Sequence, residues 1–211
     1  MTSTLKKKQQ KHARSEDKKV SILRSATKLF AENGFDATGV REIAKNSGVN
    51  IAMIYYYFQT KEGLYQEILE DACKALSLSL TDSIDREMEP EENLYCFIKT
   101  YINFLQNQQT LHQIFLRETI SQTKLMKKLV KEYGSKIFGL VHGILEQGVE
   151  KGVFREQDTT LSTINLLSMI RHYFTDEPLI TTLFPNKRVK MKKHLSDHIF
   201  NIFMQGVKSS P

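Results

Sequence analysis

The sequence predicts an all-α protein, with a three-helix, helix-turn-helix head at the N-terminus and a larger helical bundle after it. Three observations lead to this prediction. Apolar residues recur at helical spacing through most of the 211 residues, no stretch alternates as a strand would, and residues 38–61 hold two short helical patterns around a glycine. The length suffices to bury a core in one large domain or in two small ones.

The charge of the chain is concentrated at its N-terminal end. Residues 1–63 contain twelve Lys and Arg against six Asp and Glu, whereas the remaining residues are balanced, so the whole net charge of +6 lies in this first segment. Such an asymmetry indicates a head that binds a polyanion, joined to a neutral body.

Several classes of protein are disfavoured by the composition. No run approaches the roughly 18 apolar residues of a membrane span, and the lysine-rich start lacks the apolar stretch of a signal peptide, so we expect a cytoplasmic protein without a membrane partner. Cys73 and Cys96 are far apart and are interpreted as small apolar packers. The chain has no phosphate loop, HExxH motif or catalytic triad spacing, which leaves an enzyme as the weak alternative and predicts no catalytic residue and no cofactor.

The first helix is expected over residues 17–33. Gly34 should end it in a left-handed conformation, with Phe35 packing back on Phe30. Residues 1–16 are basic and lack apolar periodicity, which predicts a flexible arm. That arm is either a solubilising tail or an extension that adds phosphate or minor-groove contacts to DNA.

The next two helices form the predicted helix-turn-helix. Ile43 and Ala44 belong to one apolar stripe, Gly48 permits the sharp turn, and Ile54 continues the stripe in a second helix over residues 50–57. Asn50 should cap this second helix, so that Ile51, Ala52 and Met53 stand at its exposed N-terminal end. In helix-turn-helix proteins this end reads the major groove.

This segment resembles the DNA-binding module of the TetR family of bacterial one-component repressors. The matching residues, in order, are Asn33-Gly34-Phe35, Arg41-Glu42-Ile43-Ala44, Gly48-Val49 and Tyr55-Tyr56-Tyr57-Phe58-Gln59-Thr60-Lys61. The similarity covers about residues 17–69. Beyond them it implies an all-helical domain for ligand sensing and dimerisation, without supplying motifs. The predicted organisation is therefore an arm over residues 1–16, a DNA-binding domain over 17–64 and a sensing and dimerisation domain over 65–211.

The resemblance also implies which residues contact DNA. Ile51, Ala52 and Met53 align with residues that approach base edges, but here they are apolar and can touch only thymine methyl groups. We therefore expect Arg41 and Tyr55 to carry more of the specificity. The full predicted set is Arg41, Asn50, Ile51, Ala52, Met53, Tyr55, Tyr57 and Lys61.

The roles of the three adjacent tyrosines and of Lys61 are less direct. Tyr55, Tyr56 and Tyr57 fan out around a helix, so all three cannot face the core. Tyr56 is expected to pack between helices, whereas the resemblance implies that Tyr55 and Tyr57 reach phosphates; the alternative is that all three pack. Lys61 lies in the first turn of a helix, where the helix dipole disfavours a cation unless a phosphate sits there.

The body is predicted to contain only helices. The first continues from residue 61 to about 79, an acidic linker covers 82–89, and later helices cover 90–107, 110–120, 122–151, 158–175 and 188–207. Residues 178–185 are expected to be an irregular apolar connection. Polar groups on apolar faces suggest a ligand cavity lined by Tyr101, Phe104, Phe115, Glu118, Met169 and His172, although a residue of this kind, taken alone, is more often ordinary core.

The last helix is the predicted dimer interface. Its stripe of Leu195, Ile199, Ile202 and Phe203, together with the helix at 158–175, offers more apolar surface than one body can readily cover. His194 and His198 share the i, i+4 spacing of metal ligands, but no third ligand is near, so they are interpreted as surface residues and no metal is predicted.

These observations lead to one functional hypothesis and three alternatives. We expect a ligand-responsive repressor that binds a palindromic operator in double-stranded DNA as a homodimer and responds to an unidentified small-molecule effector. One alternative is a helical small-molecule-binding or scaffold protein without DNA binding, which the basic head disfavours. An activator built on the same module and an enzyme are the other two.

Overall fold

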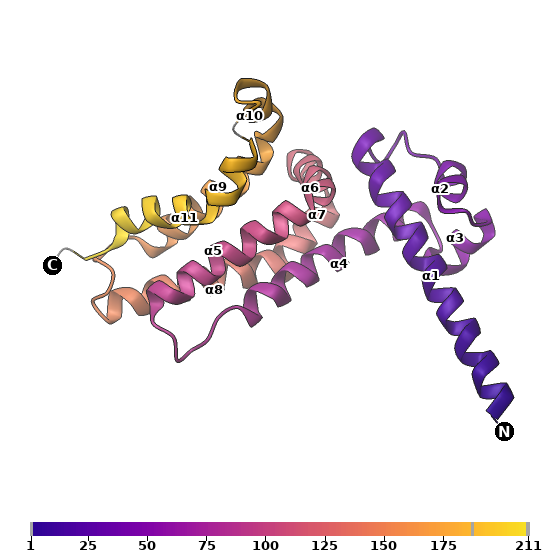
Figure 1. Ribbon diagram of the computed structural model, residues 1–211, viewed down its shortest axis with the longest axis horizontal. Helices are drawn as coiled ribbons and strands as arrows, with labels where there is room; N and C mark the ends of the chain where they lie inside the picture. Colours follow the sequence, from indigo (N-terminus) through magenta and orange to yellow (C-terminus); the bar gives the residue numbers. More distant parts are fainter. Residues whose placement is uncertain (1, 187, 210–211) are drawn as a thin grey trace.

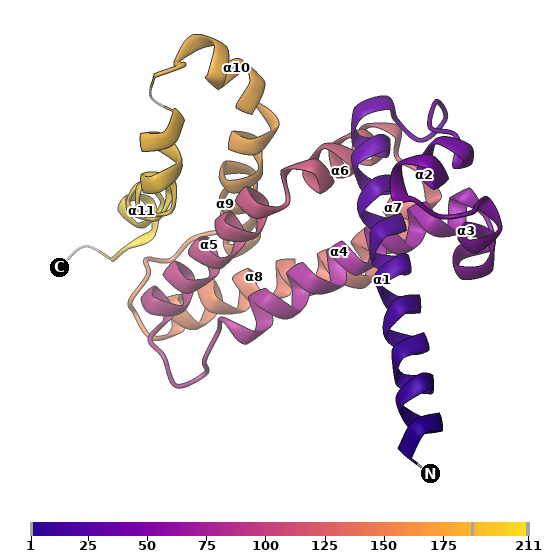
Figure 2. The same ribbon diagram turned by 45° about the vertical axis from the view of Figure 1, so that its right-hand side comes forward.

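The computed structural model describes residues 2–186 and 188–209 and is almost entirely helical (Figure 1). The molecule is elongated, with the N-terminal head at one end, the body at the other, and α4 running from one into the other (Figures 1 and 2). In the described part of the chain the only β-type pairing is an isolated bridge between Phe154 and Lys208. The all-α fold predicted from the sequence is confirmed.

The head contains α1 (Thr2–Asn33), α2 (Val40–Ser47), α3 (Ile51–Phe58) and the start of α4 (Lys61–Asp82). At the end of α1 the amide of Gly34 donates to the Phe30 carbonyl at 3.0 Å, and Gly34 has a φ of 82°. The Phe35 ring stacks on Phe30 with centroids 5.8 Å apart. The predicted glycine stop and the packing of Phe35 are both confirmed.

The structure differs from the sequence-based expectation at the N-terminus. α1 begins at Thr2, so the residues expected to form a flexible arm are helical. This first half of α1 projects away from the rest of the head (Figures 1 and 2). The physical reason is propensity: Lys, Gln, Ala and Arg favour helix even without an apolar face, and no Gly or Pro interrupts residues 2–33. Whether this segment contacts DNA stays a prediction.

The body follows the predicted order with two additions. Its elements are α5 (Pro90–Asn107), α6 (Gln109–Ser121), α7 (Lys124–Leu129), a π-helical turn η1 (Val130–Gly134), α8 (Ser135–Glu150), α9 (Thr159–Thr175), α10 (Glu177–Leu183) and α11 (Arg188–Val207). The segment expected to be an irregular connection is largely the short helix α10, because Pro178 can occupy its first turn, where no backbone N–H is needed. The π turn interrupts the single helix predicted over 122–151, and sequence periodicity gives no sign of it.

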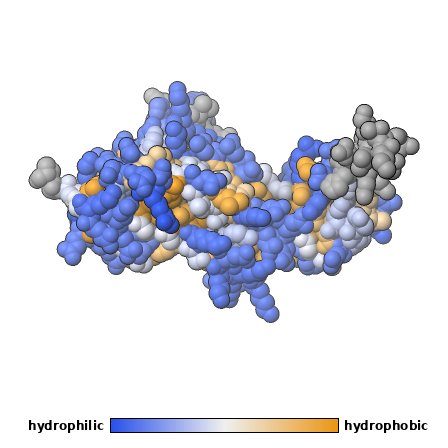
Figure 3. Space-filling model, turned by 90° about the horizontal axis from the view of Figure 1, so that it is seen from below, coloured by the Kyte–Doolittle hydropathy of each residue, from blue (hydrophilic) through white to orange (hydrophobic). Residues whose placement is uncertain are grey.

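Two hydrophobic cores fill the molecule. The body core draws on α5, α8, α9 and α11, with Phe97, Ile98 and Phe154 among its fully buried side chains. The second core, which we call the junction core, joins α1–α4 residues such as Ile22, Ile43 and Ile54 to Ile114 of α6 and Leu129 of α7. The core of the head therefore extends into the body. The face shown in Figure 3 is largely hydrophilic, with apolar residues in strips between polar ones.

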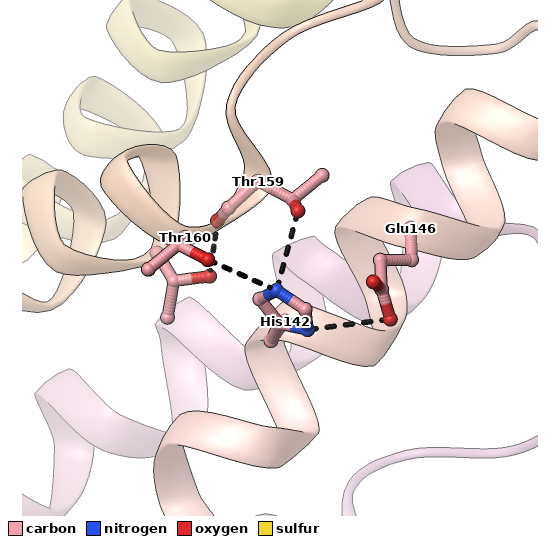
Figure 4. A network of polar contacts seen from close by, with 5 residues as sticks. His142, Glu146, Thr159 and Thr160 are labelled. Carbon is pink, nitrogen blue, oxygen red and sulfur yellow. Dashed lines mark hydrogen bonds and ion pairs between the residues drawn. The ribbon is translucent and has the colours of Figure 1, made fainter.

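At the far end of the body, a polar network fixes the start of α9 on α8 (Figure 4). His142 Nε2 lies 3.2 Å from the Thr159 hydroxyl and 3.4 Å from that of Thr160, while its Nδ1 lies 3.2 Å from a Glu146 carboxylate oxygen. Asp158 caps the same helix by accepting the Leu161 amide at 2.9 Å. These contacts satisfy polar groups at the first turn of α9 and set its position beside α8.

Candidate nucleic-acid interface

The turn between α2 and α3 is built as the sequence predicts. Gly48 has a φ of 69°, and the Val49 amide donates to the Ala44 carbonyl at 3.1 Å. Ile43 and Ile54 are fully buried between the two helices. The Asn50 side chain accepts the Ala52 amide at 3.0 Å and so caps α3. The two helices are thereby held at a fixed angle, with the N-terminal end of α3 outward.

The outward surface of α2 and α3 carries several of the predicted contact residues. Arg41 and Ala52 are exposed, and Tyr55 keeps 48% of its surface accessible. Ile51 and Met53 are half-buried, and the Met53 sulfur lies 3.8 Å from the Lys18 ammonium of α1. A DNA groove placed against this surface would meet the Arg41 guanidinium and the Tyr55 phenol. It would also meet the apolar side chains of Ile51, Ala52 and Met53.

The tyrosines do not take the roles expected of all three. Tyr56 is 79% exposed, so the expectation that it packs between helices is wrong. Tyr57 instead turns toward α1, where its hydroxyl donates to the Ser15 carbonyl at 3.0 Å and lies 2.6 Å from the Ser15 hydroxyl. Which side of α3 is covered depends on how α1 crosses it. The spacing of three adjacent tyrosines does not specify this crossing.

Lys61 is held inside the head. Its ammonium donates to the carbonyls of Phe35 at 2.8 Å and Thr38 at 3.1 Å, with Asp36 at 3.5 Å, and lies 4.3 Å from the centre of the Phe35 ring. These contacts satisfy carbonyls of the loop between α1 and α2. The partial negative charges of these carbonyl oxygens therefore already surround the Lys61 ammonium.

The residues expected to line a ligand cavity do not gather in one place. Tyr101 is buried in the body core, and Phe104 and Met169 pack at the edge of that core. Phe115 packs on the junction core, while His172 is exposed and pairs with Asp176 at 2.9 Å. Helical periodicity identifies which side of a helix is apolar, but not which neighbouring helix covers it.

Glu118 is one of these residues, and it lies between the head and the body. The Tyr65 hydroxyl of α4 donates to one of its carboxylate oxygens at 2.8 Å, and the Thr123 hydroxyl, which caps α7, donates to the other. Both Tyr65 and Glu118 are buried. Burial, and then the bond to Glu118, raise the pKa of the Tyr65 phenol. The carboxylate therefore ties α6 to α4 and α7.

A groove of about 510 Å³ lies on the other side of α6, against α9 and α10. None of the residues predicted for the ligand cavity lines it. Its walls are formed by Gln109, His112, Gln113, Leu116, Arg117, Phe174, Thr175, Glu177, Pro178 and Thr181. Sequence reasoning missed this groove because one of its walls, formed by Glu177, Pro178 and Thr181, comes from α10, which was expected to be irregular.

The predicted dimer stripe is divided by the fold. Leu195, Ile199 and Phe203 are buried in the body core of their own chain, and only Ile202 remains exposed, at 46%. On the adjacent α9, Leu161 is 57% exposed and Ile164 45%. Ile202 of α11 and Leu161 and Ile164 of α9 are therefore apolar side chains that these two helices leave exposed.

Among the described residues, no group of three or more His, Cys, Asp or Glu could hold a metal ion, and His194 and His198 are exposed on α11. Cys73 is half-buried, and burial raises the pKa of its thiol to about 12, as for a packing residue. In the described part of the chain no helix is both long and apolar enough to cross a membrane.

Comparison with known proteins identifies two family models along the chain. Residues 22–68 match "Bacterial regulatory proteins, tetR family", and residues 87–175 match "Tetracyclin repressor-like, C-terminal domain". The first match covers the helix-turn-helix and the second covers α5 to α9 with their connections. The N-terminal model therefore matches the head and the C-terminal model matches the body.

Similar proteins agree with these matches. The chain is 30% identical over 132 residues to the probable HTH-type transcriptional regulator YttP of Bacillus subtilis, covering 62% of this chain and 64% of YttP. It is 26% identical over 137 residues to the HTH-type transcriptional repressor KstR2 of Mycobacterium tuberculosis, covering 64% and 68%. A solved tetR-family regulatory protein from Rhodococcus RHA1 superposes with a TM-score of 0.76 at 17% identity, covering 92% and 98%, which shows the shared fold.

Proposed function

Because the chain belongs to the tetR family of bacterial transcriptional regulators, we propose that it is a ligand-responsive repressor that binds a palindromic operator as a homodimer. The observation that carries this proposal is the capped, outward N-terminal end of α3 on a head that holds the whole net positive charge. The cytoplasm, where such an operator lies, is the location that we propose, with the domain division at residue 64.

Within the interface we assign two kinds of role. The side chains of Arg41, Ala52 and Tyr55 are accessible, so we propose that they meet the major groove of DNA, with Ile51 and Met53 touching thymine methyl groups at its edge. Asn50, Tyr57 and Lys61 already bond within the head. We therefore assign them to positioning α3 and its neighbours, although the sequence placed them among the DNA contacts.

Dimerisation follows from the outer face of α9 and α11. Leu161 and Ile164 of α9 and Ile202 of α11 leave apolar surface on two helices that contact each other. Pairing this face with its copy across a two-fold axis buries that surface. Two heads placed in this way would read half-sites one helical turn apart, or a multiple of that, which is about 34–36 Å.

The proposal is tested by selecting bound fragments of bacterial genomic DNA and measuring affinity for the selected site. Arg41→Ala should relax the preference at one base pair, at a cost of about 1–3 kcal/mol if Arg41 reads a guanine edge. Arg155→Ala, an exposed arginine at the far end of the body, is the matched control and should change nothing. A uniform loss over all operator variants would make Arg41 a phosphate contact.

Failure to select any sequence would favour the alternative, a helical small-molecule-binding or scaffold protein without DNA binding. The sign of regulation is measured separately, by placing the selected site in front of a reporter gene. Lower reporter output in the presence of the protein is expected of a repressor, and higher output would indicate an activator.

A further inference from the structure

Among the described residues that line it, the groove between α6, α9 and α10 combines an apolar wall with one cationic side chain, Arg117. Leu116, Phe174 and Pro178 supply the apolar part. Of the two charged side chains that line it, Glu177 is already paired with the Lys192 ammonium at 2.7 Å. Arg117, in contrast, has no carboxylate within ion-pair distance among the described residues. The groove thus suits a small molecule with an apolar body and an acidic group.

His112 does not compete with Arg117 for this role. Its imidazole lies 3.4 Å from the Thr175 hydroxyl, and burial, followed by the charge of Arg171, lowers its pKa, with Glu177 acting in the opposite sense. A neutral imidazole can hydrogen-bond to a ligand but brings no charge. The guanidinium of Arg117 therefore remains the group that distinguishes an acid from a neutral molecule.

Arg117 has a second contact, which links the groove to the head. One of its guanidinium nitrogens, Nη1, donates to the Phe30 carbonyl of α1 at 3.1 Å. The same carbonyl accepts the Gly34 amide that ends α1. A side chain that lines the groove therefore also holds the last turn of the first helix of the head.

We propose that the groove binds a small amphipathic carboxylate whose acid group takes Arg117 from the Phe30 carbonyl and so loosens the head from α6. A guanidinium bonds a carboxylate with two parallel, charge-assisted hydrogen bonds, which are stronger than its single bond to a neutral carbonyl. This inference rests on the proposed function, because it names the effector class and the contact through which the effector acts.

The neighbouring residue extends the effect to α4. Glu118 follows Arg117 on α6 and accepts the Tyr65 hydroxyl. A shift of this turn of α6 therefore changes one contact with α1 and one with α4 together, and these two helices carry α2 and α3. A ligand in the groove therefore shifts the position of the head through α6 as well as along α4. By linkage, a ligand that binds the shifted state more tightly lowers the affinity for the operator.

The test uses the full chain with two probes of the same body, 4-phenylbutyrate and the neutral 4-phenylbutan-1-ol. In calorimetric titration the carboxylate should bind the parent at least tenfold more tightly than the alcohol. Arg117→Gln should reduce this preference to within twofold, and Arg117→Lys should retain part of it. Arg155→Gln is the matched control, because Arg155 also donates to a backbone carbonyl, that of Gly206, but lies far from the groove.

Hydrogen exchange reads the link to the head. With the carboxylate bound, amides of residues 109–121 should exchange more slowly and those near residues 30–36 several-fold faster; Arg117→Gln should show the faster exchange at 30–36 without any probe. An equal response to the two probes, no response to either, or a preference that survives in Arg117→Gln would overturn the proposal. Operator binding by the unliganded parent is measured alongside, so that loss of the proposed function and loss of this site are distinguished.

Discussion

The two hydrophobic cores differ in how they relate to the order of the chain. The body core is assembled from residues 80–207, all of which follow α3, whereas the junction core begins at Ile22 and ends at Leu129. Its last buried members, Ile114 and Leu129, come from α6 and α7. The head therefore completes its core with side chains that belong to the body.

This difference changes how a signal can travel. α4 is the continuous element that joins head and body, so a tilt of α4 is one way in which the body can act on the head. The structure adds a non-covalent connection, since α6 packs on α1 and supplies Arg117 and Glu118 to the head-side helices. A head cut from the chain after α4 would expose the surface that Ile114 and Leu129 cover, so it is a poor test of where sensing occurs.

The largest effect is expected from Ile114→Ala, with Ile144→Ala as its match in the body core. Both side chains are buried, at 1% and 4% exposure, so each truncation should cost about 2–5 kcal/mol. The two variants should differ in where amide exchange becomes faster. Ile114→Ala should speed exchange in residues 38–61, and Ile144→Ala should not. Equal exchange in the head for both variants would mean that the head is stable without α6.

A smaller effect is expected from Tyr65→Phe, which removes the hydroxyl that donates to the buried Glu118 carboxylate. Leaving one oxygen of the carboxylate without this donor should cost about 1–3 kcal/mol in the free energy of unfolding, measured in urea. Tyr56→Phe is the control, because a side chain that is 79% exposed should change stability by less than about 0.5 kcal/mol. Equal losses of unfolding free energy for the two variants would show that the Tyr65–Glu118 hydrogen bond does not contribute to stability.

The same pair predicts a response to alkaline pH. Burial and the Glu118 bond raise the pKa of Tyr65 above its ordinary value of 10.0, so the folded state holds this proton more tightly than the unfolded state does. The associated stability is present below pH 10 and is lost as the pH rises above it. Tyr65→Phe should therefore lose less stability than the parent between pH 9.5 and 11. Parallel curves for the two proteins would contradict this.

The smallest effect is expected from Lys61→Met, which keeps the aliphatic packing near Phe35 but removes the bonds to the loop carbonyls. A loss of about 1 kcal/mol in unfolding free energy is expected. The salt dependence of operator binding should be unchanged, because the ammonium is engaged within the head. If the slope of log affinity against log salt concentration were smaller by about 0.9 in the variant, Lys61 would be a phosphate contact, as the sequence predicts.

The head shows how far sequence reasoning reaches. The stop at Gly34, the turn at Gly48 and the cap at Asn50 all follow from local backbone chemistry, and each is present as predicted. The partners of Tyr57 and Lys61 are Ser15 and the loop at 35–38, which lie 42 and 23–26 residues away in the chain. Long-range partners of this kind leave no periodic signal, so neither the resemblance nor the helix dipole at Lys61 could predict them.

The sequence by itself determined most of the helices, their order, the turn that presents α3 and the charge of the head, because these depend on 3.6-residue periodicity, caps and composition. The tertiary structure decided which apolar faces meet. Leu195, Ile199 and Phe203 form a stripe that suits either a core or a dimer interface, and only the packing of α11 on the body core places them inside and leaves Ile202 outside. Arg117 likewise becomes a link between a groove and the head only because α6 crosses the end of α1. Hydrophobic burial is non-directional, so a sequence can specify that a face is to be covered without specifying by what.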